Sequence, residues 1–270
     1  MQRTYGNGRA SFKWDERSGI SRLDGLYQEG AAKIRFPRVY GERAEAVLIN
    51  TSGGITGGDA LHWQLEAGDN TCVDVTTQAC EKLYKSNGGV ATVSTVLKVG
   101  EGADLHWLPQ ETIAYNNSAL KRELSVYMHP SARFLAVEAF LLGRQAMGET
   151  VEQGSLKDRW RIFKGERLIH GEDLDLGGAI YESSGKAAVL DGARAFASVL
   201  YVGPEDDEQM ETLLSSIKPK APDLSFGVSV FNGKTTARLA AADGISLRRS
   251  LVPFLQAMRG GTPLPKLWNS

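Results

Sequence analysis

The sequence predicts a mainly β fold with two helices toward the C-terminus. Apolar and polar residues alternate with a period of two along many segments, which is typical of strands with one buried face. Glycine accounts for 30 of the 270 residues. Turn residues recur between the alternating segments, as in proteins built from short connected strands. The segments with clear helical spacing lie after residue 203.

The first clear strand starts at residue 60, where Leu61, Trp63 and Leu65 alternate with polar residues. A turn at 67–70 leads to the next strand, and a second turn at 86–90 contains Asn-Gly, a pair that suits a tight hairpin. Similar alternation predicts the other strands, at 71–78, 90–100, 120–128, 158–171 with a hairpin at Lys164-Gly165, 193–203, and 225–240 with a hairpin at Asn232-Gly233.

Two segments have helical spacing. In 204–218, Pro204 and acidic residues open the helix, as the helix dipole favours, and its apolar residues follow at i, i+3, i+4 and i+7. In 245–259, five apolar residues fall on one face: Leu247, Leu251, Phe254, Leu255 and Met258. Pro253 lies inside this second segment, so we expect either a kink or a helix that begins late.

Composition excludes several functional classes. A net charge of −1 gives no broad attraction for nucleic acid or anionic lipid. We expect no membrane span, because no run of about 18 apolar residues occurs. The two cysteines, Cys72 and Cys80, fit a reducing cytoplasm. No linker or low-complexity segment divides the chain, which favours a single domain over residues 1–270.

The segment NTSGGITGGD, residues 50–59, contains four glycines: Gly53, Gly54, Gly57 and Gly58. A P-loop would need Lys-Ser/Thr after its last glycine, and a dinucleotide loop would open a helix. Here Asp59 follows, its charge would repel phosphate, and a strand comes next. We therefore interpret the glycines as permitting a tight crossing between strands, with Asp59 presented at its rim.

Other chemistry is weakly indicated. No histidine pair has metal-ligand spacing, so a metal site stays unknown, and we expect His62 and His106 to be partly solvated strand residues. No Gly-x-Ser-x-Gly elbow is present. Carboxylates are plentiful, so a β-rich carbohydrate-active enzyme or a glycan-binding module is the alternative. In the apolar segment 138–149, Glu138, Arg144 and Glu149 must be paired or line a wet cavity.

Four segments resemble the urease accessory protein family UreD, also called UreH: LINTSGGITGGDAL, VTTQACEKLYKS, LHWLPQETIAYNNS and EAFLLGRQAMGE. Their order and spacing match, and the resemblance covers nearly the whole chain. Cys80-Glu81 departs from the family pattern, which has small or hydroxyl residues there. Besides the four glycines, the motif residues are Thr76, Thr77, Gln78, Lys82, Tyr84, Pro109 and Gln110.

The resemblance implies a fold and a role. The fold is a β-helix-like stack of strands with a pair of helices. The role is that of an accessory scaffold or metallochaperone component rather than an enzyme. It binds urease apoprotein and recruits UreF and the GTPase UreG, so that nickel reaches the urease active site. Nickel would pass in transit through an internal polar tunnel, with no tightly bound cofactor.

Two sets of residues are candidates for these tasks. Scattered oxygen donors suit transit better than a closed cage, because an ion held in a closed site would not leave. The candidate tunnel lining is Asp59, Glu111, Glu138 and Glu149, with Arg144 as an ordering partner. The apolar face of 245–259 is the candidate surface for UreF, unless it packs on its own sheet.

Overall fold

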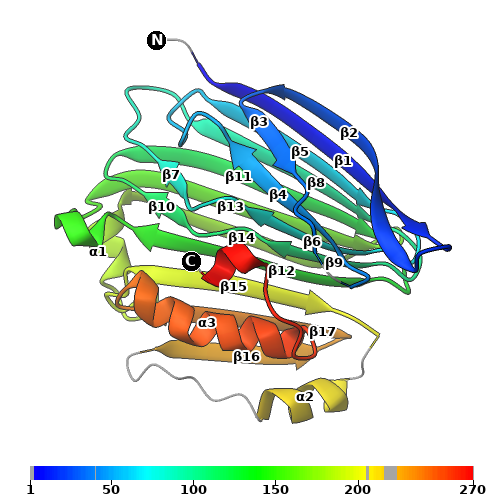
Figure 1. Ribbon diagram of the computed structural model, residues 1–270. Helices are drawn as coiled ribbons and strands as arrows, with labels where there is room; N and C mark the ends of the chain where they lie inside the picture. Colours follow the sequence, from blue (N-terminus) through cyan, green and yellow to red (C-terminus); the bar gives the residue numbers. More distant parts are fainter. Residues whose placement is uncertain (1–2, 40, 205–206, 216–223, 270) are drawn as a thin grey trace.

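The computed structural model describes residues 3–39, 41–204, 207–215 and 224–269. Its strands form two sheets that face each other across an apolar core (Figure 1). Sheet A contains, in spatial order, β14 (Arg167–Ala179), β13 (Gln153–Lys164), β11 (Ser118–Met128), β8 (Ala91–Val99), β5 (Ala60–Ala67), β1 (Tyr5–Asp15) and β2 (Ile20–Gly30).

Sheet B is the larger of the two. Its main path is β16 (Ser225–Phe231), β17 (Lys234–Ala241), β15 (Ala195–Val202), β12 (Arg133–Leu142), β9 (Asp104–Leu108), β6 (Cys72–Thr77), β4 (Ala44–Asn50) and β3 (Ala32–Arg35). Two short strands extend this sheet beside the main path. They are β10 (Thr112–Ala114), which pairs with β12, and β7 (Glu81–Leu83), which pairs with β10.

The chain winds between the two sheets as in a β-solenoid. From β4 to β13 it repeatedly crosses from one sheet to the other, and each return adds a parallel strand beside the previous one. The predicted stack of strands is confirmed. The hairpins at Lys164-Gly165 and Asn232-Gly233 are also confirmed. The hairpin expected at 86–90 is wrong, because that turn carries the chain from β7 in sheet B to β8 in sheet A.

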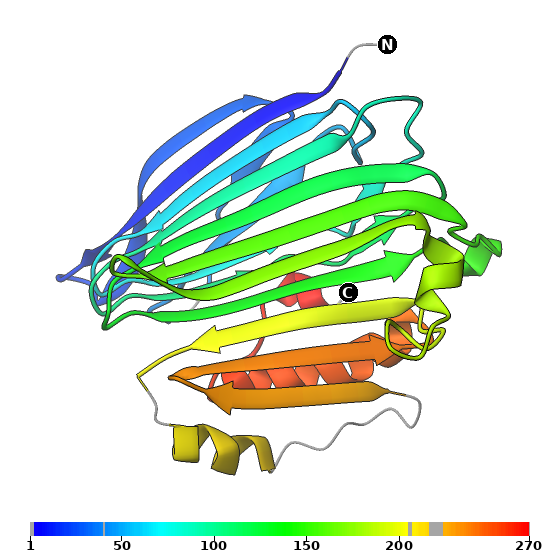
Figure 2. The ribbon, with the colours of Figure 1, turned by 180° about the vertical axis from the view of Figure 1, so that it is seen from behind.

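Alternation decides which face of each strand is inside. In β12 the even-numbered Phe134 and Ala136 join the core between the sheets, whereas the odd-numbered Leu135 and Val137 belong to a second core on the outer face of sheet B. Both faces of this strand are therefore buried, and it reads as a nearly continuous apolar run. Figure 2 shows the opposite side of the molecule, where none of the described helices lies across sheet A.

Three α-helices occur among the described residues: α1 (Ile180–Ser184), α2 (Asp207–Ser215) and α3 (Gly244–Met258). The two C-terminal helices are confirmed, although 205–206 and 216–218 of the first prediction lie outside the described residues. The short α1 was not predicted. Helix α3 begins at Gly244 and continues through Pro253, so the late start is wrong. Short 3-10 turns cover Gln145–Met147 and Lys266–Asn269.

Helix α3 lies along β15 and β17 on the outer face of sheet B (Figure 1). Its five apolar residues form part of the second core, and each is at most 5% exposed: Leu247, Leu251, Phe254, Leu255 and Met258. The expectation that they offer a surface to UreF is thus corrected. They pack on their own sheet, where burial of each such side chain contributes about 1.5–3 kcal/mol.

No helix within the described part of the chain is both long enough and apolar enough to cross a membrane.

Candidate functional site

A small cavity, with a mostly apolar wall that includes several charged groups, lies between the two sheets. It has a volume of about 60 Å³, and both sheets contribute to its wall. Most of the wall is apolar, from residues such as Trp63, Trp107 and Leu120. The rest is polar or charged, in the middle of an apolar core, and consists of Thr77, Glu81, Thr95, Gln110, Thr112, Arg122 and Glu138. We call this space the internal cavity.

One side of the internal cavity is a buried charge cluster. Arg122 donates two hydrogen bonds of 2.9 Å to the carboxylate of Asp158, and its Nη1 lies 2.6 Å from Oε2 of Glu138. Trp107 donates to Glu138 at 2.8 Å, and Trp160 donates to Asp158 at 3.1 Å. The Arg122 guanidinium therefore pairs with two carboxylates, and each of the three residues is at most 8% exposed.

The strands explain why these groups meet. Arg122 and Asp158 occupy inward-facing positions of β11 and β13, which are parallel neighbours, and the two residues are direct register partners. Glu138 faces inward from β12 on the other sheet. Burial raises the pKa of Glu138 above the usual range, and the charge of Asp158 adds to that rise, although Arg122 opposes it.

Glu81 is a second carboxylate on the wall, at the side of the glycine loop. Asn50 donates to both of its oxygens, at 3.1 and 3.3 Å, and the same amide donates to the Gly54 carbonyl. No ion pair within 4 Å reaches Glu81 from the described residues. Burial raises its pKa to about 7, although the bonds from Asn50 and the Lys82 N–H oppose the rise.

We expect Glu81→Gln to change how stability depends on pH. Because the folded protein holds this proton up to about pH 7 and the unfolded chain releases it near 4.5, wild-type stability falls as pH rises between these values. The glutamine variant lacks this loss. At pH 8 it should be more stable by roughly 2–3 kcal/mol, and at pH 4.5 nearly equal. Urea unfolding at both pH values measures this.

The control is Glu123→Gln, because Glu123 is exposed on the outer face of sheet A, next to Lys121. Glu123→Gln should differ from wild type by the same amount at pH 8 as at pH 4.5. If Glu81→Gln also shows no change between the two pH values, the pKa of Glu81 is not raised in the folded protein.

Sheet B is interrupted beside the internal cavity. Between β9 and β10 the chain passes through Pro109, Gln110 and Glu111 without strand pairing on its main path. Gln110 lines the cavity, and its side-chain oxygen accepts from Arg248 of α3. Arg248 also donates to Glu111 at 2.6 Å and stacks on Trp268. Helix α3 and the C-terminal segment thus cover this break from outside.

Two atoms of the wall lack hydrogen bonds. Nε2 of Gln110 and Oε2 of Glu138 are buried without a hydrogen-bond partner among the described residues, although Oε2 is in an ion pair with Arg122. Buried polar groups are normally satisfied by protein or by water. The Gln110 amide is therefore, within the described part of the chain, an unpaired donor on the wall of the internal cavity.

The glycines of the loop permit positive φ angles and close backbone approach, as expected. Gly53, Gly54 and Gly58 have positive φ angles of 74°, 148° and 89°. A Cβ on Gly57 would lie 2.5 Å from the Gly89 carbonyl. The position of Asp59 differs from the expectation. Instead of standing at the rim it is 5% exposed, and it accepts hydrogen bonds from the Thr4 and Thr56 N–H groups at 2.8 and 2.9 Å.

Gly54→Ala should therefore destabilise the fold far more than Gly53→Ala. A Cβ on Gly54 would lie 2.4 Å from the Tyr84 ring and 2.7 Å from the Lys82 carbonyl, whereas nothing lies within 4 Å of one on Gly53. Positive φ alone costs about 1–2 kcal/mol in each variant. The clash should add roughly 1–3 kcal/mol at Gly54. Equal midpoints of thermal unfolding would refute the close approach.

The five candidate lining residues do not lie together. Of the five, only Glu138 lines the internal cavity. Asp59 anchors the glycine loop, and Glu111 accepts hydrogen bonds from Arg248 and Cys80 beside the cavity. Arg144 and Glu149 form an ion pair of 2.7 Å in an exposed loop, which supports their interpretation as a structural pair.

The motif residues gather at one end of the sheets. Thr77 and Gln110 are linked, since the Thr77 hydroxyl accepts from the Gln110 N–H at 2.8 Å, and both line the cavity with Pro109. Thr76 is buried in β6, and Gln78 follows it, its N–H bonded to the Leu48 carbonyl. Lys82 and Tyr84 are exposed beside the glycine loop.

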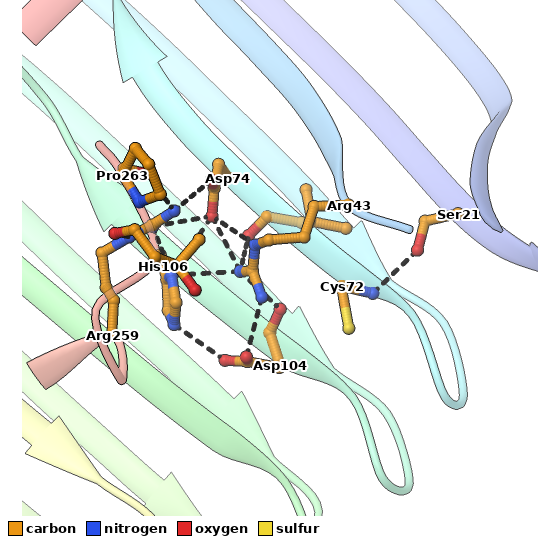
Figure 3. Close-up of polar contacts among 10 residues, drawn as sticks. Ser21, Arg43, Cys72, Asp74, Asp104, His106, Arg259 and Pro263 are labelled. Carbon is orange, nitrogen blue, oxygen red and sulfur yellow. Dashed lines mark hydrogen bonds and ion pairs between the residues drawn. The ribbon is translucent and has the colours of Figure 1, made fainter. Parts of the chain in front are cut away.

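A second charge cluster, on the outer face of sheet B, was not predicted (Figure 3). Asp74 accepts from Arg259 at 2.7 Å and from Arg43 at 2.9 Å. The His106 ring lies between two carboxylates, with Nδ1 3.1 Å from Asp74 and Nε2 2.9 Å from Asp104. His106 is 4% exposed, so the expectation of a partly solvated residue is wrong.

This cluster fastens the end of α3 to the sheet. Arg259 follows the helix directly, and the cluster lines a groove of about 730 Å³. Burial alone would raise the pKa of Asp74. Its hydrogen bonds from His106 and Arg259 and the charge of Arg43 outweigh burial and hold that pKa well below its usual range. Asp74 is therefore a negatively charged anchor for Arg43 and Arg259 at neutral pH.

The described residues contain no group of three or more His, Cys, Asp or Glu side chains placed to hold a metal ion.

Fold and cavity together define a class: a β-solenoid of two stacked sheets that encloses buried charges. Comparisons specify the family. Residues 6–269 match the family described as UreD urease accessory protein. The chain is 50% identical over 268 residues to the urease accessory protein UreD of Rhizobium johnstonii. This match covers 99% of this chain and 96% of the relative. It is 51% identical over 269 residues to the urease accessory protein UreD of Agrobacterium fabrum. That match covers 100% of this chain and 92% of the relative.

The chain belongs to the UreD family of urease accessory proteins. This family is described as accessory to an enzyme and not as an enzyme, which places the chain in urease maturation and sets aside the carbohydrate-active alternative.

Proposed function

We propose that the protein binds urease apoprotein in the cytoplasm, recruits UreF and the GTPase UreG, and lets nickel pass to the urease active site through the space between its sheets. Nickel is the cargo of this process and not a resident cofactor. The observation that supports the proposal is the internal cavity, where Glu81, Glu138 and Arg122 bring charge into an otherwise apolar core.

Charge in such a place requires an explanation other than stability. Removing two charged groups from water has a desolvation penalty that their attraction often fails to offset, and apolar residues of similar volume are frequently more stabilising. Here Glu81, a carboxylate with no cationic partner among the described residues, lines the same cavity as the Arg122 cluster. A site that must interact with a passing cation explains why the fold retains these groups.

The chemistry of the wall suits a cation in transit. Ni²⁺ binds oxygen and imidazole donors, and passage requires contacts weak enough to release the ion. The wall offers separated carboxylate, amide and hydroxyl groups, with Arg122 next to Glu138 to limit its affinity for a second positive charge. Because Glu81 and Glu138 have raised pKa values, an arriving cation can displace a proton from each.

The test is co-expression of urease subunits, UreF and UreG with and without this chain, tagged for purification. With the chain we expect a joint complex, and urease that contains nickel and hydrolyses urea. Without it, urease should stay poor in nickel and inactive. Urease that matures equally well in both cultures, with no complex recovered, would contradict the proposal. Nickel uptake of the two cultures, measured in whole cells, is the control.

A further inference from the structure

We propose that one end of the molecule is the docking surface for an acidic surface of a partner protein. Four segments form this end, residues 51–58, 82–86, 115–117 and 143–149, and we call it the glycine-loop end. The inference rests on the proposed function, because a maturation factor has to hold a partner protein in a fixed position. It adds the place of contact and the charge of the partner.

Hydrogen bonds and ring contacts join the four segments into one surface. The Tyr84 hydroxyl donates to the Gly53 carbonyl at 3.3 Å, and the Tyr84 and Tyr115 rings meet edge to face at 5.1 Å. The Arg144 guanidinium stacks 4.3 Å from the centre of the Tyr115 ring. The Asn116 N–H donates to Glu149, the ion-pair partner of Arg144. These contacts hold the Tyr84 and Arg144 side chains in place before any partner arrives.

The side chains presented there are of the kinds enriched in protein interfaces. Tyr84 is 39% exposed, Met147 is 74% exposed, and the Arg144 side chain is 44% exposed. Tyrosine, methionine and arginine are over-represented at interface cores, and arginine and tyrosine among binding hot spots. Gly54 leaves no room for a Cβ beneath the Tyr84 ring, so the loop is shaped to seat this partly exposed aromatic residue.

The charge of this end indicates the partner's charge. Its four segments contain three cations, Lys82, Lys85 and Arg144, and one acidic residue, Glu149, which is paired with Arg144. This leaves an excess of two positive charges in a chain whose net charge is −1. Both lysines are exposed, and neither forms an ion pair with another described residue. Such a patch attracts an acidic surface and accelerates its association.

Other faces suit a partner less well. On the outer face of sheet A many lysines are already in ion pairs, such as Lys98 with Glu66 and Lys157 with Asp175, whereas the two lysines of the glycine-loop end have none among the described residues. The apolar face of α3 is already buried against sheet B.

The experiment compares two charge reversals of equal size. Lys82→Glu/Lys85→Glu alters the glycine-loop end, and Lys121→Glu/Lys157→Glu alters the outer face of sheet A, where both lysines are exposed. The dissociation constants for apo-urease and for UreF are measured at two salt concentrations. We expect the first variant to bind one of the two proteins at least about tenfold more weakly, equivalent to about 1.4 kcal/mol. It should also show a smaller salt dependence, and the control variant should bind like wild type.

Two results would count against the inference in different ways. If wild type binds a partner and Lys82→Glu/Lys85→Glu binds both as wild type does, the docking surface lies elsewhere and the proposed function is unaffected. If wild type binds neither apo-urease nor UreF, the proposed function fails and the docking surface fails with it. Thermal unfolding of each variant verifies that these exposed substitutions leave the fold intact.

Discussion

Arg122→Met should destabilise the protein by about 3–5 kcal/mol, the usual effect of removing one partner from a buried ion pair. The methionine has a similar volume, so the loss comes from charge. Asp158 and Glu138 would remain in the core without their shared cation, and both are at most 5% exposed. Because domains are typically stable by only 5–15 kcal/mol, the midpoint of urea unfolding should fall sharply.

Two further variants make this result specific. Lys121→Met removes the neighbouring cation of β11, which pairs with Glu123 on the exposed face, and should cost at most about 1 kcal/mol. The neutral triple variant Arg122→Met/Glu138→Gln/Asp158→Asn should recover at least about 2 kcal/mol of the loss, since it leaves no unpaired charge. If Arg122→Met were no less stable than Lys121→Met, the charge cluster would not be buried as described.

Glu138→Gln should lower nickel loading of urease at least about tenfold, which corresponds to a transit barrier raised by about 1.4 kcal/mol. The glutamine oxygen can still accept from Trp107, and Arg122 keeps its two bonds to Asp158, so the fold should survive. What disappears is the carboxyl group that can exchange its proton for a passing cation. Nickel per urease in the purified complex, with the amount of complex, is the measurement.

Glu123→Gln is the matched control for this variant, because it neutralises an exposed carboxylate on the outer face of sheet A. It should load urease normally. A Glu138→Gln variant that forms the complex and also delivers nickel at the wild-type level would remove Glu138 from the proposed path.

Much of the fold could be predicted, but its topology could not. Alternation located the strands because each strand needs one face against a core, and this signal is local. Whether a glycine turn closes a hairpin or crosses to the other sheet depends on distant pairing. The turns at 86–90 and at Asn232-Gly233 look alike in sequence, yet only the second joins antiparallel neighbours.

The site shows the same division. Arg122 and Asp158 fall on the apolar phase of their strands, next to Leu124 and Leu156, and this is a signal that sequence analysis could use. That they meet depends on the parallel register of β11 and β13, which the local pattern does not specify. His106 lies on the face of β9 opposite Trp107, as strand alternation requires. Its burial comes from Arg259, 153 residues later, which no local pattern can reveal.

The most direct test of passage through the protein is to fill the internal cavity and leave the outside unchanged. Thr95 lines the cavity from β8 and is 3% exposed, and methionine adapts to irregular gaps. Ser94→Met, one residue earlier on the outer side of the same strand, is the control. Nickel per urease would be measured in complexes matured with each variant. The account predicts a strong loss with Thr95→Met alone, in an intact complex. Full nickel loading with the cavity filled would contradict it.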